Sequence, residues 1–425
     1  MIIRSDFWNE QYSYYKLNNG LEVFLLNKAD FKKTFCYLAV NYGSLDNEFI
    51  PPFQNEYVRM PYGIAHFLEH QMFENNQNIN AEFTKFGAEC NAFTSFDRTT
   101  YAFSSCQNII APLELLLDFV QKPNYNNKTI EKERSIILQE LMMYEDNPQI
   151  MLFQETLNAM YKQTDIRIDI CGTEESIKEI NKKHLDLCYE TFYHPSNMCL
   201  VVVGPINEQE ILETIENNQN KKKFREYVKI HRKYPEEIST VKEKKVVKPF
   251  NLTVPKLAIG IKLPSFKKNS LELLRKDLSL SMLVDYNFDE TSDFYELLLE
   301  KELLNDTYGY ETQIDDGFSY CYFSLDSYRY NEVIELIKSK LLNLSKLTEE
   351  EFIRYKNTII ASNIRKMNSL EYYGTSLVDG CFCNLTLFQI MDEINNITLE
   401  DVNSLIEYFN DDNISVVVIK DEEDL

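Results

Sequence analysis

The chain has 425 residues, of which 44% are hydrophobic and 13% aromatic, and its net charge is −23 at pH 7. This length exceeds the size at which a single hydrophobic core stops growing, so two domains are expected, and the apolar content excludes a disordered chain. The acidic charge argues against nucleic-acid binding, and no apolar run reaches the roughly 18 residues needed to cross a membrane.

Cysteine usage points to a reducing compartment. The chain has nine cysteines, an odd number, and no C-x-x-C pair, which argues against a disulfide framework and against a cysteine zinc site. The first residues lack the basic region and apolar stretch of a signal peptide. We therefore expect free thiols and a cytoplasmic location.

The first half of the chain alternates between strands and helices. A hairpin is predicted over 14–28 around the turn Asn18-Asn19-Gly20. Further strands are predicted over 34–42, 89–94, 99–105 and 197–203, and helices over 62–75, 80–86, 111–122, 127–146, 149–161, 176–192 and 207–218.

A stretch rich in Lys and Arg separates the two halves. We interpret 219–248 as a linker between an N-terminal domain, 1–218, and a C-terminal domain, 249–425. In the second half, strands are predicted near 239–247, 254–262, 307–313, 317–325 and 414–419, and helices near 269–286, 291–304, 330–342, 347–366, 369–377 and 399–409.

The ends of the two halves resemble each other. Phe192 and Asn197 lead into the strand 201–203, and Phe409 and Asn413 lead into the strand 416–418. The repeat distance is about half of the chain length. An internal duplication explains that distance better than coincidence.

The chemistry is centred on His66-x-x-Glu69-His70. Two histidines four residues apart lie one helical turn apart on the same face, where their imidazoles can hold one metal ion, and imidazole suits zinc. Glu69 lies between them, close enough to take a proton from a water activated by the metal. The order H-x-x-E-H is typical of the inverzincins. The competing interpretation is two histidines on an ordinary surface helix.

A catalytic zinc needs a third protein ligand. Glu133 and Glu140 are seven residues apart on one helix face, with Ile136 and Ile137 between them, so this face points at least partly inward. A buried carboxylate is costly unless it is paired or bound to a metal, so we propose Glu140 as the ligand and Glu133 as a supporting partner of a ligand or of the bound water. Solvated helix glutamates remain the alternative.

Glu74, one turn beyond His70, is a rival third ligand by spacing. A straight helix places three residues at i, i+4 and i+8 poorly around one tetrahedral ion, so Glu74 ranks below Glu140.

Together these motifs resemble the pitrilysin/insulinase metallopeptidase family. The resemblance covers nearly the whole chain and rests on the ordered occurrence of His66-Phe67-Leu68-Glu69-His70, Gly87-Ala88-Glu89-Cys90-Asn91-Ala92-Phe93-Thr94-Ser95, Glu133-Arg134-Ser135-Ile136-Ile137-Leu138-Gln139-Glu140 and Phe192-Tyr193-His194-Pro195-Ser196-Asn197.

The resemblance implies an α+β fold with two homologous α/β-roll domains, each a mostly antiparallel sheet with helices packed on it, which together form half of a clamshell. It implies one zinc ion per chain. His66, His70 and Glu140 match the zinc ligands, Glu69 matches the general base, and Glu133 matches the supporting glutamate.

The same resemblance assigns a substrate-binding strand. Asn91, Ala92, Phe93 and Thr94 match the sheet edge that pairs with a peptide substrate, a mode whose main-chain hydrogen bonds tolerate varied sequences. Without the resemblance, this strand could equally be ordinary sheet.

One segment departs from the family pattern. The family uses an Arg and a Tyr from a C-terminal half, and here Leu299 stands where the Arg would be, while a Tyr remains at Tyr308 or Tyr310. An apolar Leu cannot donate a hydrogen bond to a substrate carbonyl. We therefore expect a paralogous partner subunit that supplies the Arg and Tyr, and a homodimer is the less favoured arrangement.

The sequence thus predicts a zinc endopeptidase that cleaves peptides or unfolded segments in an enclosed chamber, either a specific precursor or oligopeptides in general. A non-catalytic structural subunit is one alternative, and a different metal-dependent hydrolase is another. The complete H-x-x-E-H set with Glu140 argues against a scaffold, which has no need of it.

Overall fold

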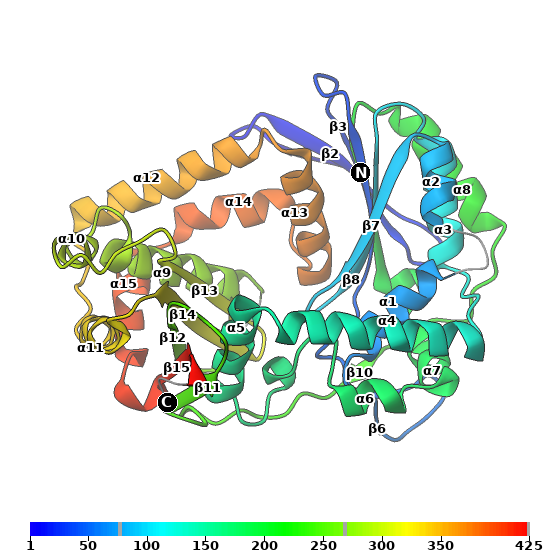
Figure 1. The fold of residues 1–425 in the computed structure, drawn as a ribbon. Coiled ribbons are helices and arrows are strands. Elements are labelled where there is room, and N and C mark those ends of the chain that lie inside the picture. Colours follow the sequence, from blue (N-terminus) through cyan, green and yellow to red (C-terminus); the bar gives the residue numbers. More distant parts are fainter. Residues whose placement is uncertain (75–78, 267–269, 423–425) are drawn as a thin grey trace. The chain divides into compact units, whose positions relative to one another are not determined.

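A computed structural model describes residues 1–74, 79–266 and 270–422, and its residues group into two compact units (Figure 1). Unit 1 contains Met1–Leu141, Asp169–Tyr234 and Arg365–Ile390, and unit 2 contains Met142–Ile168, Pro235–Ile364 and Met391–Leu425. Each unit therefore includes segments from both halves of the chain. The predicted domains, 1–218 and 249–425, are continuous segments of the sequence, and these boundaries stay a prediction.

Unit 1 is built on a seven-stranded sheet with the order β1-β2-β3-β9-β4-β8-β7. Its strands are β1 (Ile2–Ser5), β2 (Glu10–Lys16), β3 (Glu22–Asn27), β4 (Thr34–Val40), β7 (Ala88–Thr94), β8 (Thr99–Ser105) and β9 (Met198–Gly204). All neighbours are antiparallel except β3 and β9. The strand β9 is buried at every position because it lies inside the sheet and is covered on both faces.

Unit 1 also holds a small sheet with the order β10-β5-β6. Its strands are β5 (Glu48–Ile50), β6 (Val58–Arg59) and β10 (His231–Arg232). In β10, Arg232 forms an ion pair of 2.8 Å with the buried Asp46, so the first half of the predicted linker is tied to unit 1.

Unit 2 is built on a five-stranded sheet with the order β11-β15-β12-β14-β13. Its strands are β11 (Lys245–Pro249), β12 (Lys256–Lys262), β13 (Gly309–Asp315), β14 (Phe318–Asp326) and β15 (Ile414–Lys420). One pair, β11 with β15, is parallel, and the others are antiparallel. The predicted mostly antiparallel α+β architecture is confirmed in both sheets.

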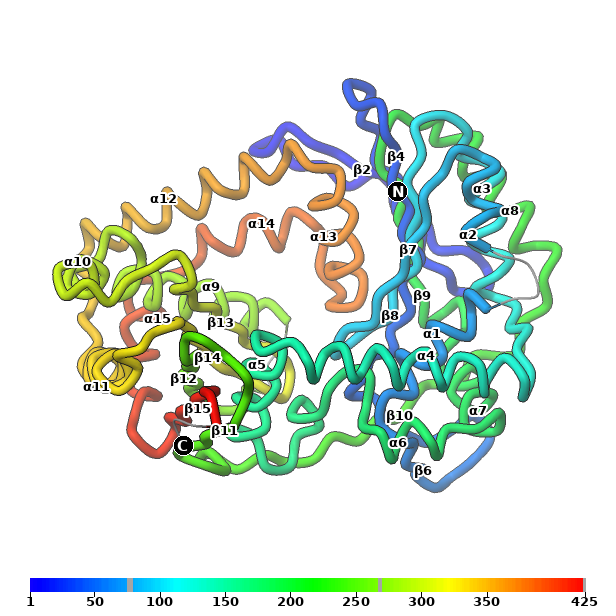
Figure 2. Tube along the Cα trace, viewed as in Figure 1, coloured from blue at the N-terminus to red at the C-terminus, as the bar shows by residue number. Residues whose placement is uncertain are grey.

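The helices cover these sheets. They are α1 (Ile64–Phe73), α2 (Ile79–Lys85), α3 (Ile110–Val120), α4 (Asn127–Glu145), α5 (Pro148–Met160), α6 (Glu174–Glu179), α7 (Lys182–Phe192), α8 (Glu208–Asn220), α9 (Ser270–Phe288), α10 (Asp293–Glu300), α11 (Tyr330–Leu341), α12 (Glu349–Lys366), α13 (Leu370–Cys383), α14 (Leu387–Asn396) and α15 (Leu399–Ser404). In unit 1, α1, α3 and α8 lie on one side of the sheet and α13 packs on the other, against β4 and β9 (Figure 2).

The two sheets repeat one pattern of five strands. The order β3-β9-β4-β8-β7 in unit 1 corresponds to β11-β15-β12-β14-β13 in unit 2, with the parallel pair in the same place. The asparagine before the last strand of each repeat makes the same contact: Asn197 Nδ2 donates to Phe192 O at 2.9 Å, and Asn413 Nδ2 donates to Tyr408 O at 3.0 Å. The predicted homologous domains are therefore seen in topology and in local detail.

Several secondary-structure predictions were wrong or incomplete. The helix predicted over 176–192 is two helices, because Ile180 is extended and Asn181 begins α7 by accepting hydrogen bonds from Lys183 N and His184 N. Strands β1, β5, β6 and β10 and helix α14 were not predicted. Strand β1 has four residues and pairs with β2 directly after it in the chain, whereas α14 buries Met391 and Ile394 in the tertiary fold.

Within the described residues, no helix is both long and apolar enough to span a membrane. This finding agrees with the absence of long apolar runs in the sequence.

Candidate metal centre

The N-terminus of α1 is fixed by close backbone contact with the loop before α6. Gly63 has φ 79°, and a Cβ there would lie 2.1 Å from Cys171 O. Gly172 has φ 92°, and a Cβ there would lie 2.6 Å from Tyr62 O. Glycine is required at both positions because only a residue without a Cβ allows this backbone conformation and approach. This contact sets the position of the first turn of α1.

The two motif histidines and Glu140 converge. Glu140 Oε2 lies 3.8 Å from His66 Nε2 and 3.5 Å from His70 Nε2. Nitrogen and oxygen ligands of a tetrahedral zinc ion, with bonds of about 2.1 Å, are separated by about 3.4 Å. The three side chains therefore fit one zinc ion with little movement, although they come from α1 and α4, about seventy residues apart in sequence.

Burial keeps His66 in the form that a metal ligand needs. His66 is 8% exposed, and its Nδ1 has no hydrogen-bond partner among the residues that the structure describes. Burial, together with the neighbouring His70, lowers the pKa of His66 to about 3. A neutral imidazole is the form in which histidine binds a metal, and the His66 Nε2 faces Glu140.

Glu133 orients His70. Glu133 is 5% exposed, and its Oε2 lies 3.1 Å from His70 Nδ1, so an ionised carboxylate accepts the Nδ1–H and leaves Nε2 free to bind a metal. Burial lowers the pKa of His70, but the hydrogen bond from Glu133 and the carboxylates of Glu69 and Glu140 raise it overall. The predicted inward face of α4 holds Glu133 and Ile137, whereas Ile136 is 39% exposed.

Glu69 lies on the same helix and contacts the edge strand. Its Oε2 accepts a hydrogen bond of 2.6 Å from Thr94 Oγ1 on β7. Burial raises the pKa of Glu69, against the Thr94 hydrogen bond and the His70 charge, which lower it. A carboxylate that is 7% exposed and held by one hydroxyl is suited to accept and return a proton.

The rival ligand Glu74 points elsewhere. Its Oε1 accepts from Lys132 Nζ at 2.7 Å at the end of α1, while Glu140 lies beside both histidines. The geometry therefore favours Glu140 over Glu74.

The predicted substrate strand is an edge strand. β7 ends the sheet order and pairs only with β8 among the described strands. Ser95 N–H donates to Arg98 O at 2.8 Å, and antiparallel pairs alternate, so the peptide groups of Ala92 and Thr94 point away from β8. The outward Ala92 N–H is held at 2.9 Å by the neighbouring Asn91 Oδ1.

The two predicted tyrosines have their hydroxyls engaged within unit 2. Tyr308 Oη donates to Phe288 O at 3.0 Å, and Tyr310 Oη donates to Asp285 Oδ1 at 3.0 Å. Leu299, which stands at the expected Arg position, is 59% exposed on α10. Neither tyrosine has a free hydroxyl in this conformation, so a role in catalysis stays a prediction for both.

Sequence reasoning did not identify Cys171. One atom each of His66, Glu140 and Cys171 lies within 4.8 Å of the others, and Cys171 is 3% exposed. Cys171 lies in a loop without a recognisable motif, so no spacing could have placed its thiol beside the histidines. It reaches them through the close contact of that loop with the start of α1.

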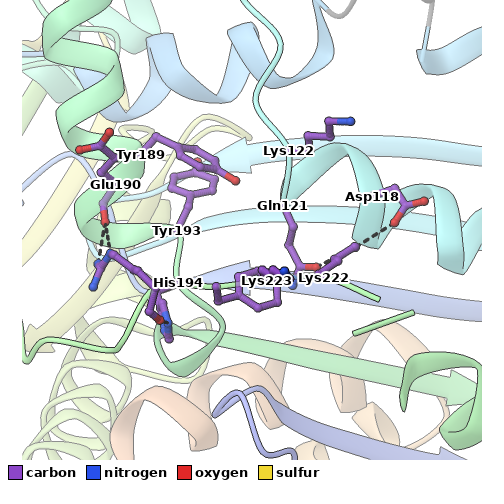
Figure 3. Close-up of a pocket in the computed structure, with 11 residues that line it drawn as sticks. Asp118, Gln121, Lys122, Tyr189, Glu190, Tyr193, His194, Lys222 and Lys223 are labelled. Carbon is purple, nitrogen blue, oxygen red and sulfur yellow. Dashed lines mark hydrogen bonds and ion pairs between the residues drawn. The ribbon is translucent and has the colours of Figure 1, made fainter. Parts of the chain in front are cut away.

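Apart from the metal centre, unit 1 has a pocket where helices α3 and α7 end (Figure 3). Two of its cations cap those ends: Lys222 Nζ donates to Leu117 O at 2.9 Å, and Arg225 Nε donates to Glu190 O at 3.1 Å. Tyr189 and Tyr193 stack on its wall with ring centroids 4.9 Å apart. We interpret these contacts as helix capping and packing.

Comparison with known protein families and relatives shows which proteins this chain resembles. The family model described as "Insulinase (Peptidase family M16)" matches residues 55–174, which include the motif helix and Glu140, and the model "Peptidase M16 inactive domain" matches residues 179–359. A curated relative, "Uncharacterized zinc protease YmfH" of Bacillus subtilis, is 40% identical over 394 residues, which are 92% of this chain and 92% of that protein. This chain belongs to the M16 peptidase family. The predicted resemblance to the pitrilysin/insulinase peptidases is confirmed.

Other relatives match part of the sequence or share the fold. "Mitochondrial-processing peptidase subunit beta" of Bos taurus is 33% identical over 159 residues, which are 36% of this chain and 32% of that protein. The crystal structure of a putative M16-like peptidase from Alicyclobacillus acidocaldarius has a TM-score of 0.92 at 33% identity and covers 97% of this chain and 98% of that one. The periplasmic protease PqqL from Escherichia coli has a TM-score of 0.71 at 17% identity, and the match covers 97% of this chain but 48% of PqqL, so that likeness shows the fold alone.

Over nearly its whole length, the chain is related to a protein named as a zinc protease and to an M16-like peptidase. The family membership supports a peptidase with zinc as its metal.

Proposed function

We propose that this chain is a zinc-dependent endopeptidase and that His66, His70 and Glu140 bind its zinc ion. The observation that carries the proposal is the convergence of two imidazole nitrogens on Glu140 Oε2, at 3.8 and 3.5 Å, beside the buried carboxylate of Glu69. Zinc, when bound, acts as a Lewis acid on the peptide carbonyl and makes water a stronger nucleophile at neutral pH.

The chain's own residues handle the proton. Glu69 accepts the proton of the attacking water and delivers it to the leaving amine nitrogen, so it is again a carboxylate at the end of the cycle. Thr94 orients Glu69 through the 2.6 Å hydrogen bond, and Glu133 fixes the tautomer of His70. Each of these roles uses a contact within unit 1.

The peptide substrate is proposed to bind along β7. An extended peptide that adds to this edge would meet the outward peptide groups of Ala92 and Thr94. Thr94 would then connect the bound main chain to Glu69, which places the scissile bond near the general base. Main-chain recognition of this kind tolerates many side chains and suits peptides or unfolded segments. A specific precursor peptide is one such substrate.

We further propose that the active enzyme is a heterodimer enclosing a chamber, as two halves of a clamshell. Leu299 cannot supply the charged donor expected at its position, and it is 59% exposed. A paralogous subunit with Arg and Tyr in that segment would complete the site. The name of the related mitochondrial-processing peptidase subunit beta describes that protein as a subunit.

The heterodimer is tested by measuring peptide cleavage by the purified chain alone and together with a paralogous chain. Low activity alone and high activity in the mixture are expected. Full activity of the chain as a homo-oligomer would contradict the need for a partner.

The proposed location is the cytoplasm. All nine cysteines are free thiols, which suits a reducing compartment. A fusion of the chain with a reporter that is active only in the cytoplasm tests this location.

The peptidase mechanism is tested with Glu69→Gln. The variant should lose about 10² to 10⁴-fold in kcat while keeping its zinc, since general-base catalysis contributes about that much and Glu69 is not a ligand. His66→Ala should instead lose the metal, measured by elemental analysis. Full activity of Glu69→Gln would contradict the role of Glu69, and a zinc-free wild type would favour the non-catalytic structural subunit.

A further inference from the structure

Cys171 has no role in the mechanism above, yet its thiol lies at the metal centre. One ligand atom from each of His66, Glu140 and Cys171 falls within 4.8 Å of the others. Cys171 is 3% exposed, so its thiol faces the interior of unit 1 rather than solvent. Its neighbour His66 is 8% exposed and has a buried Nδ1 without a hydrogen-bond partner in the described part of the chain.

The backbone around Cys171 is held firmly. Cys171 O packs where a side chain at Gly63 would stand, and Cys171 N donates to Asp169 Oδ1 at 2.7 Å. Ser176 Oγ also donates to Tyr62 O at 2.9 Å, which ties the start of α6 to the segment before α1. The sulfur is therefore presented to the site by a rigid loop.

The distances suit coordination. Ligand atoms around a tetrahedral zinc ion are about 3.4 to 3.7 Å apart, with the longer values for sulfur, because Zn–S bonds are about 2.3 Å long. The upper limit of 4.8 Å for this group is within about an ångström of that spacing.

The thiol also has a proton acceptor. The Asp169 carboxylate is half-buried and lies beside Cys171, whose backbone N–H donates to Asp169 Oδ1 at 2.7 Å. Zinc binds the thiolate, so the S–H bond must break as the metal–sulfur bond forms. Asp169 can take that proton and pass it to solvent, and no oxidant or reductant is needed.

We propose that Cys171 is a further metal ligand of this chain and that, before substrate binds, its sulfur fills the position that catalysis needs open. This inference rests on the proposed zinc site and adds a regulating group to it. A zinc ion with four protein ligands is typical of a structural site, and a catalytic site keeps one position open. Cys171 would therefore hold the metal tightly and restrain hydrolysis until a bound peptide displaces the sulfur.

The competing interpretation is an ordinary buried thiol beside Asp169. The two interpretations differ in one observable, a bond between the metal and sulfur. Cobalt(II) reports this bond directly, because thiolate ligation gives an intense charge-transfer absorption in the near ultraviolet that nitrogen and oxygen ligands do not give.

The experiment replaces the metal of the full chain with cobalt(II) and compares the wild type with Cys171→Ser. We expect the charge-transfer absorption in the wild type and its loss in Cys171→Ser, while the visible bands of cobalt held by His66, His70 and Glu140 remain. Cys106→Ser, which removes an exposed thiol, is the matched control and should keep the absorption. Glu69→Gln should also keep it.

Two outcomes would overturn the proposal: visible cobalt bands without a charge-transfer absorption in the wild type, or an unchanged absorption in Cys171→Ser. Failure of the wild type to bind cobalt would instead contradict the zinc site itself, so the two proposals fail in different ways. If Cys171→Ser does not fold, ¹¹³Cd NMR of the wild type decides, because a single thiolate ligand moves the cadmium resonance strongly downfield.

Discussion

Thr94 Oγ1 donates a 2.6 Å hydrogen bond to Glu69 Oε2, which joins the edge strand β7 to the proposed general base on α1. Hydrogen bonds to a charged group contribute about 1.5 to 3 kcal/mol. We predict that Thr94→Val lowers kcat about 10- to 100-fold with zinc content unchanged. Thr94→Ser keeps the hydroxyl and should retain most of the activity, and equal activity of Thr94→Val and wild type would show that the bond is not used.

Glu133 supports zinc binding through His70, at 3.1 Å from Nδ1. Loss of such an outer carboxylate costs about 10- to 100-fold in metal affinity, so Glu133→Gln should bind zinc that much more weakly in competition with a chelator. The exposed Glu145→Gln on the same helix is the control and should leave the affinity unchanged. Wild-type affinity in Glu133→Gln would remove Glu133 from the site.

The outward peptide group of Ala92 is predicted to bind substrate. Proline is tolerated on a sheet edge whose N–H points outward, so Ala92→Pro should fold but lose one main-chain donor. A hydrogen bond contributes about 0.5 to 1.5 kcal/mol, which predicts a KM about 2- to 10-fold higher with little change in zinc content. Ala92→Ser keeps the N–H and serves as the control. An unchanged KM in Ala92→Pro would place the substrate elsewhere.

The buried pair of Glu237 and Lys262 in unit 2 predicts a pH dependence of stability. Glu237 Oε1 accepts from Lys262 Nζ at 2.8 Å, and the two side chains are 3% and 2% exposed. Burial alone would raise the pKa of Glu237, but hydrogen bonds from Lys262 and from the backbone N–H groups of Thr164 and Gln163 lower it to about 2.

Because the pKa of Glu237 is lower in the folded chain than its unfolded value of 4.5, the stabilisation is complete above pH 4.5 and is lost as the pH falls toward 2. Glu237→Gln should lower the free energy of unfolding by about 3 kcal/mol at neutral pH, and the difference from wild type should shrink as the pH falls through this range. Urea unfolding measures the free energy of unfolding and its change with pH, and the exposed Glu236→Gln is the control. A difference that does not depend on pH would assign the loss to packing.

The sequence could predict those site residues that lie on one helix, because helical periodicity relates their positions. His66, Glu69 and His70 share one helix, so their spacing alone predicts that they lie together. The third ligand needed a physical argument about a buried carboxylate, and the sequence left Glu74 as a rival. Only the packing of α4 against α1 brings Glu140 to within 3.8 Å of His66, and no local pattern encodes the distance between two helices.

By itself, the sequence determined the class of chemistry and the α+β alternation, because these depend on residue type and on periods of two and 3.6 residues. The recurrence of Phe192 and Asn197 as Phe409 and Asn413 indicated the duplication. The tertiary structure decided which strand is the free edge, which hydroxyl holds Glu69, and that Cys171 faces His66 and Glu140. These contacts join residues far apart in the chain, and their positions follow from long-range packing, such as that of Gly63 on the Cys171 backbone.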